Sequence, residues 1–401
     1  MSPEKTNEAG TGFPDSHGRT RSGLTILCVC ALISMLVPFA AKAGEDILPE
    51  RLVHAGTSLF KDFDPKAKMT ENLSGAVCAT PQDCIVVADS MIGLQAIKID
   101  PGQPRYEAGR NFIELFGAYC KDVEDEHACQ NWDLEGIARD GETVYFTGSL
   151  GLRKSSAKRQ STRWTVVEIV HPEGDAKVRR LATRRTGTLD GLFPESEPDL
   201  DRYVDKPLQC GGVNVEGFAF LDGRLYFGLR SPAARNHGIA YVVAARPDRV
   251  FGSGPKKDSK RKVYSLRFRK KDGSPRGNIG IRALERFGDR LIIATADAGV
   301  DDVKEKHRHR LVKRCRRLVA DAIPANLAED PRMRGRLWIW SPGNGDPVEI
   351  GRIDGGDYKR KKLEGVAVLK ADGNRADLLL VFDGLDEDHA LAIARGVVIP
   401  D

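Results

Sequence analysis

Residues 133–149 read DLEGIARDGETVYFTGS, and the same pattern returns twice more along the chain. Residues 214–231 read NVEGFAFLDGRLYFGLRS, and residues 362–384 read KLEGVAVLKADGNRADLLLVFDG. Each copy has a Glu-Gly pair, a short apolar run, a turn rich in Gly and Asp, and a second apolar run. Short apolar runs separated by such turns predict paired β-strands rather than helices.

Two further copies depart from the pattern at the glutamate. Residues 72–90 carry Ser74 at that position, and residues 280–297 carry Arg282. Every copy is followed by a third strand-like run, at Leu94–Ile99, Trp164–Val170, Ile239–Ala244, Leu337–Trp340 and Ala390–Ala394. Fourth runs follow in the first four copies, at Arg105–Asn111, Lys177–Ala182, Val263–Arg269 and Val348–Ile353.

Four-stranded units in series are the pattern of a β-propeller, in which a strand from one terminus completes the last sheet. Arg51–Phe60 is a run that can supply this strand. We therefore predict an all-β propeller of five four-stranded blades. Six or seven blades remain an alternative if the two longer gaps each hide a degenerate unit. A β-sandwich or two sheet domains would not explain why the Glu-Gly pair recurs.

The first 43 residues have the pattern of a secretory signal peptide. Arg19 and Arg21 precede an uncharged apolar run, Leu24–Ala41, and Ala41-Lys42-Ala43 matches a small-x-small cleavage site. A single membrane anchor is the alternative. We expect a signal peptide at 1–43, one propeller domain at 44–401 with a basic insertion at 299–335, no stable membrane span after cleavage, and a periplasmic or secreted protein.

Six cysteines remain after residue 43, and an even number in an exported chain suggests disulfides. Cys78 and Cys84 flank the turn of one hairpin, so we expect them to pair. Cys120 and Cys129 lie in one linking loop and form the second expected pair. Cys210 and Cys315 lie on loops of neighbouring blades at the same face, and form the third.

The Glu-Gly repeats, at Asp133–Ala138, Val215–Phe220 and Leu363–Val368, resemble an exported bacterial family of unknown function. They also look like the phytase-like and esterase-like propellers, whose blades open with D-x-E-G-[IL]-A. More loosely they are similar to the gluconolactonase-type calcium propellers, although this chain lacks the proline that follows Glu-Gly there. The resemblance implies a propeller fold and a calcium-assisted hydrolase of an anionic phosphate or carboxylic ester.

The repeated position predicts a site at the mouth of the central channel. Because the blades share an axis, Glu135, Glu216 and Glu364 should converge there with Arg282. Three carboxylates form a metal site that suits Ca²⁺, in which Glu135 or Glu216 would activate water and Arg282 would stabilise negative charge. The alternative is structural: each carboxylate caps backbone N–H groups between blades, and the glycine allows close approach.

Composition and motifs narrow the function less than they narrow the fold. The net charge is +5, from 62 Lys and Arg against 57 Asp and Glu, and the basic loops at 151–163 and 301–317 lack interleaved aromatics, so we expect no nucleic acid partner. We expect the protein to be a monomer. Its expected partner is a small anionic ligand or an envelope component. A non-catalytic ligand- or protein-binding propeller of the cell envelope, or a lactonase, are the alternatives to the ester hydrolase.

Overall fold

The structure is a computed structural model, and the part of the chain that it describes begins at Gly44. It describes residues 44–401 except 57, 62–68, 90–92, 101, 117–131, 153–162, 184–191, 194–199, 201–202, 234–236, 253–260, 299–312, 314, 316–334, 356–357, 360 and 386–388. The predicted signal peptide, the pair Cys120–Cys129 and nearly all of the basic insertion lie outside these residues. No helix among the described residues is long and apolar enough to cross a membrane.

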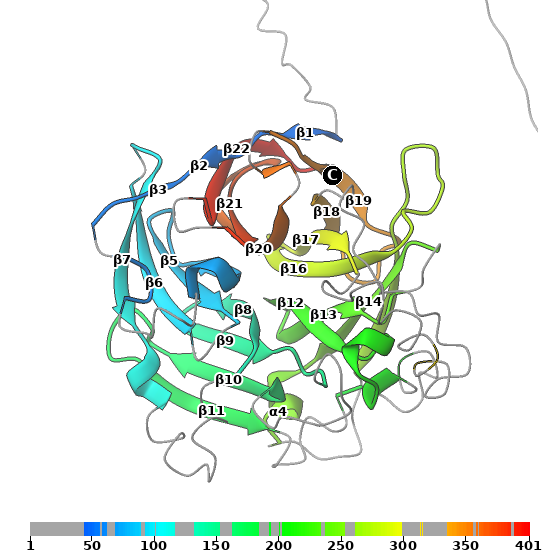
Figure 1. Cartoon of the computed structure of the whole chain (residues 1–401), viewed down its shortest axis with the longest axis horizontal. Coiled ribbons are helices and arrows are strands. Elements are labelled where there is room, and N and C mark those ends of the chain that lie inside the picture. The colour runs from blue at the N-terminus through cyan, green and yellow to red at the C-terminus, as the bar shows by residue number, and fades with distance from the viewer. Residues whose placement is uncertain are drawn as a thin grey trace, which may run out of the picture. The chain divides into compact units, whose positions relative to one another are not determined.

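Five sheets surround a common centre, so the protein is a five-bladed β-propeller (Figure 1). Blade 1 consists of β4 (Leu73–Cys78), β5 (Asp83–Ala88), β6 (Gly93–Asp100) and β7 (Arg105–Asn111). Blade 2 consists of β8 (Leu134–Asp140), β9 (Thr143–Gly148), β10 (Thr165–Val170) and β11 (Lys177–Thr183). Blade 3 consists of β12 (Asn214–Leu221), β13 (Arg224–Ser231), β14 (Ile239–Ala245) and β15 (Lys262–Arg267).

The last two blades follow the same order. Blade 4 consists of β16 (Ile279–Phe287), β17 (Arg290–Asp297), β18 (Arg336–Trp340) and β19 (Val348–Ile353). Blade 5 consists of β20 (Lys362–Asp372), β21 (Arg375–Asp383) and β22 (Leu391–Val398), with β2 (Glu50–Arg51) as its outer strand. Five blades are confirmed, and the two longer gaps hold no sixth sheet among the described residues. Short helices complete the chain at η2 (Met69–Asn72), η3 (Ile113–Phe116), η6 (Leu208–Cys210) and α4 (Pro247–Val250).

The N-terminal segment closes the ring by binding three blades in succession. β1 (Glu45–Ile47) adds to β19 of blade 4, β2 pairs with β22 of blade 5, and β3 (Val53–His54) adds to β7 of blade 1. The expected closing strand at Arg51–Phe60 is therefore wrong in extent. The segment runs along the outer edges of blades 4, 5 and 1 instead of forming one long strand. Each of these three edges pairs with only two or three of its residues.

A β-bulge lies at the same place in the innermost strand of every blade. In blade 2 the register shifts between Leu134 and Gly136, so Glu135 has no partner opposite it on β9. The same shift leaves Ser74, Glu216, Arg282 and Glu364 without a partner on the second strand of their own blades. A bulge bends its strand and re-aims the extra side chain. The repeated Glu-Gly position is thus a repeated bulge, and its side chain turns away from the ladder.

The glycine after each bulged glutamate allows the blades to pack closely. A Cβ on Gly136 would lie 2.5 Å from the Cβ of Phe218 in the next blade, and one on Gly365 would lie 2.8 Å from the Cα of Gly75. No side chain fits at those distances. The Glu-Gly pair that recurs in the repeat therefore has two separate causes, the bulge and the contact between blades.

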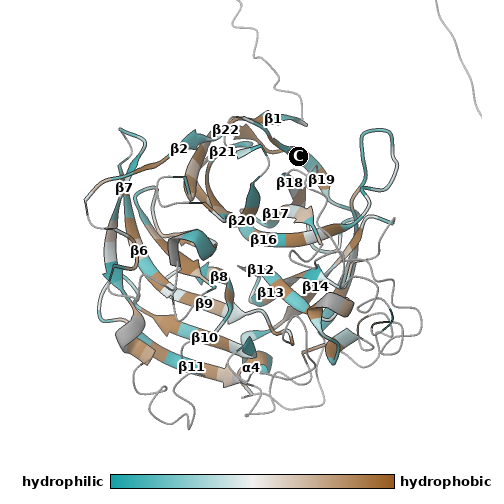
Figure 2. Ribbon diagram, in the orientation of Figure 1, coloured by the Kyte–Doolittle hydropathy of each residue, from teal (hydrophilic) through white to brown (hydrophobic). Residues whose placement is uncertain are grey.

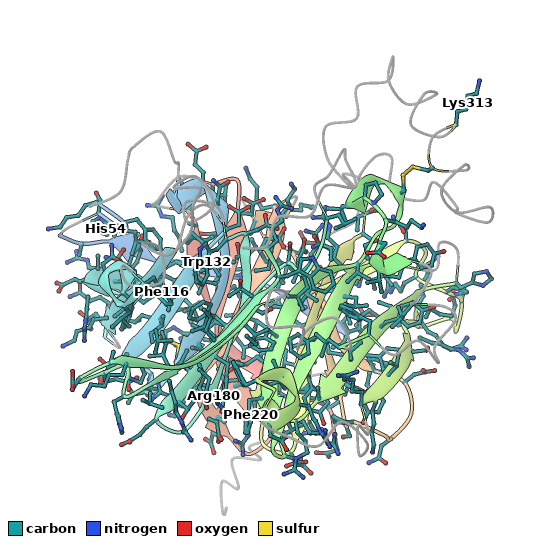
Figure 3. All side chains as sticks on the ribbon, turned by 90° about the horizontal axis from the view of Figure 1, so that it is seen from below. His54, Phe116, Trp132, Arg180, Phe220 and Lys313 are labelled. Atoms are coloured by element: carbon teal, nitrogen blue, oxygen red, sulfur yellow. A yellow bond between two sulfur atoms is a disulfide. The ribbon has the colours of Figure 1, made fainter. Side chains whose placement is uncertain are left out.

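The hydrophobic core is divided into five clusters, one at each boundary between neighbouring blades. Apolar residues recur along the strands of every sheet (Figure 2). Between blades 1 and 2, Trp132 meets Phe116 edge to face with ring centroids 5.4 Å apart (Figure 3). Each sheet is covered on one face by the preceding blade and on the other by the following blade, so most strand residues are buried. The alternation of polar and apolar residues that is typical of a surface sheet is therefore weak.

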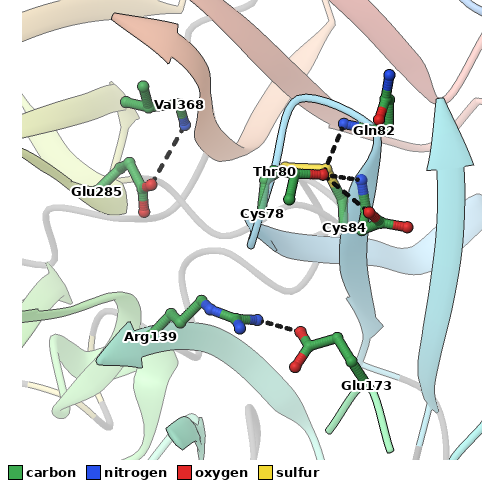
Figure 4. The surroundings of a disulfide bond; sticks show 9 residues. Cys78, Thr80, Gln82, Cys84, Arg139, Glu173, Glu285 and Val368 are labelled. Atoms are coloured by element: carbon green, nitrogen blue, oxygen red, sulfur yellow. Dashed lines mark hydrogen bonds and ion pairs between the residues drawn. A yellow bond between two sulfur atoms is a disulfide. The ribbon is translucent and has the colours of Figure 1, made fainter. Parts of the chain in front are cut away.

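Two of the three expected disulfides are present. Cys78 and Cys84 pair across the β4–β5 hairpin, where Thr80 also donates to Asp83 at 2.8 Å (Figure 4). Cys210 pairs with Cys315 and so ties the insertion of blade 4 to η6, 105 residues earlier. Both pairings were predicted, the first from its place in a hairpin and the second from loops of neighbouring blades that share a face.

Candidate functional site

A cavity of about 240 Å³ lies where the bulged residues of the inner strands converge. Its lining combines six carboxylates with three cations and several amide and hydroxyl groups. The residues are Asn72, Leu73, Ser74, Asp89, Asp133, Glu135, Arg163, Leu208, Asn214, Glu216, Arg230, Lys362, Glu364 and Asp383. The three glutamates predicted to share a site, Glu135, Glu216 and Glu364, are therefore brought together.

Glu216 is held by partners on both of its carboxylate oxygens. Oε1 accepts hydrogen bonds from Arg230 at 2.8 Å and Asn214 at 3.0 Å. Oε2 lies 3.0 Å from Nη1 of Arg282. Burial raises the pKa of Glu216, but the charges of Arg230 and Arg282 outweigh that effect and hold the pKa below its usual value. Glu216 is ionised at neutral pH.

Arg282 lies behind the cavity and links two blades to its own. Its side chain is 1% exposed and it is not among the lining residues. Nη1 contacts Glu364 at 2.7 Å as well as Glu216, and Nη2 donates to the carbonyl oxygen of Asp297 at 2.7 Å. The guanidinium thus forms ion pairs with the two glutamates on either side of it. It is placed to position them, and its charge does not face the cavity.

Glu135 has the opposite environment. Among the described residues none donates a hydrogen bond to its carboxyl or forms an ion pair with it. Burial is the largest cause that raises its pKa well above the usual value, and the nearby charges of Asp133, Glu216, Asp89 and Glu364 raise it further. Glu135 is therefore the carboxyl in this cavity that most readily keeps its proton.

Glu364 lies between these two extremes. Burial raises its pKa to about 7, Arg282 opposes the rise, and the charges of Glu216 and Asp383 add to it. Two of the other lining carboxylates have cations close by: Arg163 lies 3.0 Å from Asp133, and Lys362 lies 3.7 Å from Asp383. Burial and unequal pairing therefore shift the pKa values of three equivalent glutamates in different directions and to different extents.

The cavity has a negative formal charge. Among the described residues, six lining carboxylates face three lining cations, and Arg282 behind them makes four, which leaves −2 with every group ionised. This deficit must be met by protons or by a bound cation. Glu135 and Glu364 have the raised pKa values, so protons on these two groups can supply the whole balance.

The predicted calcium set does not fit the observed contacts. Both oxygens of Glu216 and one of Glu364 are already engaged by arginine or asparagine, so three free carboxylates are not offered to one ion. In the described part of the chain, no group of three or more His, Cys, Asp or Glu side chains has an arrangement that could hold a metal ion.

Residues that end the second strand of each blade fall in several places. Asp89, Arg230 and Asp383 line the cavity, whereas Asp297 accepts a hydrogen bond from Asn278 at 3.0 Å outside the lining. Most of the basic loop at 151–163 lies outside the described residues. Sequence reasoning did not identify Asp133, Arg163 and Lys362. Asp133 and Lys362 lie just before the Glu-Gly pair, and that position was the available signal.

The left-handed backbone of Asp133 adds a local feature to this rim. Its φ is +51°, an unfavourable region for a residue with a Cβ. The backbone is held there because the carbonyl of Asp133 accepts from Ser149 and its carboxylate pairs with Arg163. The strained residue lies two positions before Glu135, so the entry to β8 is fixed beside the carboxyl with the most perturbed environment.

Comparison with known families gives a match to part of the chain. A family described as "Protein of unknown function (DUF3616)" matches residues 188–303. The match covers blade 3 and the first two strands of blade 4, including Glu216 and Arg282, and amounts to less than a third of the chain. No curated protein matches.

Solved propeller structures are similar in architecture and distant in sequence. An α-L-arabinanase of Cellvibrio cellulosa is 11% identical, covering 80% of this chain and 90% of its own, with a TM-score of 0.40. A GH43 endo-arabinanase of Bacillus licheniformis is 11% identical over 80% and 92%, with a TM-score of 0.37. A Trypanosoma rangeli sialidase is 12% identical over 81% and 55%, with a TM-score of 0.34. At these values the similarity carries no inference about substrate or catalytic residues.

Proposed function

We propose that the cavity is the active site of a hydrolase that cleaves an uncharged ester or lactone by acid–base catalysis between carboxyl groups. The observation that supports this most is the unequal environment of Glu135 and Glu364 within one cavity. Pairs of carboxyl groups whose pKa values are pushed apart are a recurrent basis for acid and base roles. An anionic ester suits the cavity less well, because the formal charge of the lining is already negative.

Glu364 is the group that we assign as the general base. A base works best when its pKa lies near the working pH, and that of Glu364 is about 7. Oε1 is held by Arg282, which fixes the direction of the carboxylate. In the proposed step Glu364 accepts one proton from water while the water oxygen bonds to the carbonyl carbon of the ester.

Glu135 is the group that we assign as the general acid. It gives its proton to the leaving alkoxide oxygen as the carbon–oxygen bond breaks, so one water molecule is consumed and an acid and an alcohol are formed. Transfer of the proton from Glu364 to Glu135 through solvent restores the starting state. Glu216 and Arg282 then act as positioning residues, because their polar groups are occupied by each other and by Arg230.

Hydrolysis of uncharged and anionic esters tests this proposal. We expect turnover of 4-nitrophenyl acetate or δ-valerolactone, with little on 4-nitrophenyl phosphate. Glu135→Gln and Glu364→Gln should each lower kcat by about 100-fold or more. Glu107→Gln, an exposed change on β7, is the matched control and should keep full activity. The proposal is overturned if the double variant Glu135→Gln/Glu364→Gln hydrolyses these esters as fast as the natural protein.

A non-catalytic ligand-binding role is the second candidate, favoured by the dense ion pairing of Glu216. A carboxylate held by two arginines and an asparagine is typical of a rigid structural lock. An envelope setting remains part of either proposal, since Cys78–Cys84 and Cys210–Cys315 are compatible with an oxidising compartment. Ligand-induced rise in melting temperature without turnover would favour this candidate.

A further inference from the structure

The order of the five bulged residues around the ring places Ser74 between the two carboxyl groups that carry the proposed chemistry. β4 of blade 1 packs against β20 of blade 5 on one side and against β8 of blade 2 on the other. Ser74 therefore follows Glu364 and precedes Glu135 around the ring. Arg282 belongs to blade 4, between Glu216 and Glu364.

The cavity is displaced toward Ser74. Blades 1, 2, 3 and 5 all contribute to the lining, whereas no described residue of blade 4 does so. The reason is that the buried side chain of Arg282 fills the blade 4 position. At the blade 1 position the side chain is short, and Ser74 is 5% exposed with its hydroxyl donating to the carbonyl of Asn72 at 3.3 Å. A small residue thus leaves space where the repeat elsewhere carries glutamate or arginine.

We propose that the small side chain of Ser74 leaves room for a substrate subsite in the cavity. This subsite holds the carbonyl group of the substrate and the attacking water between Glu364 and Glu135. This inference rests on the proposed hydrolase. The same backbone bulge carries a glutamate in blades 2, 3 and 5, so a longer side chain is compatible with the bulge itself. What a longer side chain removes at position 74 is the open volume beside Glu135.

The subsite also limits the substrate class. It is bounded by Leu73 and by Asp89 of the same blade, both of which line the cavity. The space that a serine leaves in place of a glutamate is that of a few heavy atoms. We therefore assign to this position a small acyl group or the carbonyl edge of a lactone ring, with the leaving alcohol directed away from Ser74.

Chemical labelling of Glu135 tests the subsite without relying on turnover. A water-soluble carbodiimide with glycinamide as the amine converts an accessible, protonated carboxyl into an amide, which peptide mass spectrometry locates. We expect labelling of Glu135 at equal rates in the natural protein and in Ser74→Ala, and at least tenfold slower labelling in Ser74→Gln. Hydrolysis of 4-nitrophenyl acetate should likewise be retained in Ser74→Ala and lost in Ser74→Gln. Melting temperatures show whether each variant is folded.

A second variant keeps the test decisive if Ser74→Gln does not fold. Ser74→Cys is close in size to the natural residue and can be lengthened in the folded protein with methyl methanethiosulfonate, with the natural protein treated in the same way as the control. Labelling of Glu135 should fall only after this treatment. Unchanged labelling in the filled variants overturns the subsite. Shielded labelling in a protein that hydrolyses no ester would leave the subsite intact and overturn the proposed function instead.

Discussion

Arg282 of blade 4 and Glu364 of blade 5 are 82 residues apart in the chain, and their side chains meet at 2.7 Å inside the ring. The same guanidinium nitrogen lies 3.0 Å from Glu216 of blade 3. One buried cation therefore joins three consecutive blades through two carboxylates. Because the side chain of Arg282 is almost fully enclosed, its loss would leave two buried charges with less compensation.

Replacing Arg282 with Gln should lower the free energy of unfolding by about 3–5 kcal/mol, as expected when one partner of a buried ion pair is removed. The loss should be larger at pH 8 than at pH 5, because protonation of Glu364 relieves the uncompensated charge. Urea unfolding at both pH values measures this. The control is Arg352→Gln, since Arg352 also bridges two carboxylates, Asp46 and Asp354, but on the outer rim. Surface pairs contribute about 0–1 kcal/mol.

Glu285 gives a separate pH prediction. Burial raises its pKa to about 8, against the opposing effect of the N–H of Val368, which donates to it at 3.2 Å (Figure 4). The folded state thus binds the proton more tightly than the unfolded state, so Glu285 lowers stability increasingly as pH rises from about 4.5 to about 8. Glu285→Gln keeps an acceptor for Val368 and removes the charge.

The variant should therefore melt at a higher temperature than the natural protein at pH 8.5, and the difference should shrink toward pH 5. Thermal unfolding across this range measures the effect, with Glu107→Gln on the exposed face of β7 as the control. A difference that is constant with pH would contradict the assignment of a charged Glu285 at high pH.

Gly136→Ala should destabilise the fold by about 1–3 kcal/mol through overpacking. The added Cβ would lie 2.5 Å from that of Phe218, so blades 2 and 3 would have to separate. Gly174→Ala is the matched control because a Cβ there meets no atom within 4 Å. Equal unfolding midpoints in denaturant for the two variants would show that the contact between the blades is not tight.

The N-terminal segment offers a matched pair of leucines. Leu52 is fully buried between β2 and β3, and its N–H donates to Leu391 at 3.0 Å, whereas Leu48 is 70% exposed. We expect Leu52→Ala to cost about 2–5 kcal/mol and Leu48→Ala to change stability by less than about 0.5 kcal/mol. Denaturant unfolding of both variants decides it. If Leu52→Ala has the smaller effect, the segment contributes little to ring closure.

Calcium and chelator distinguish the two ways of balancing the charge of the cavity. Since arginines already engage Glu216 and Glu364, we expect protons to supply the balance and the melting temperature to be the same in EDTA and in millimolar Ca²⁺. A calcium-dependent rise that Glu135→Gln abolishes would instead support the predicted metal site, because a ligand that binds the folded state stabilises it by mass action.

The propeller could be predicted from sequence because its defining features are local. The Glu-Gly pair, the turn and the next apolar run all lie within about twenty residues, and the fourth strands at Arg105–Asn111 and Val348–Ile353 agree with the structure at both ends. The N-terminal segment could not be read in this way. Its three strands have two or three residues each, and their pairing is decided by the exposed edges of blades that lie far along the chain.

The convergence of the three glutamates was predictable from sequence, whereas their electrostatics were not. A shared axis was enough to bring Glu135, Glu216 and Glu364 together. Their separate ionisation states depend on which glutamate the side chains of Arg230 and Arg282 reach, and a repeat pattern holds no information about that reach. The raised pKa of Glu364 could not be predicted for this reason, since all three copies look alike in sequence.

The five bulges also bear on how such a protein could change over evolutionary time. Each bulge fixes the direction of one side chain through the backbone alone, and glutamate, serine and arginine occupy the position in different blades without altering the sheet. Single substitutions at the bulge positions can therefore change the charge and the shape of the central cavity while the sheets stay the same. A ring of repeated blades thus offers selection five equivalent bulge positions, four of which line the same cavity.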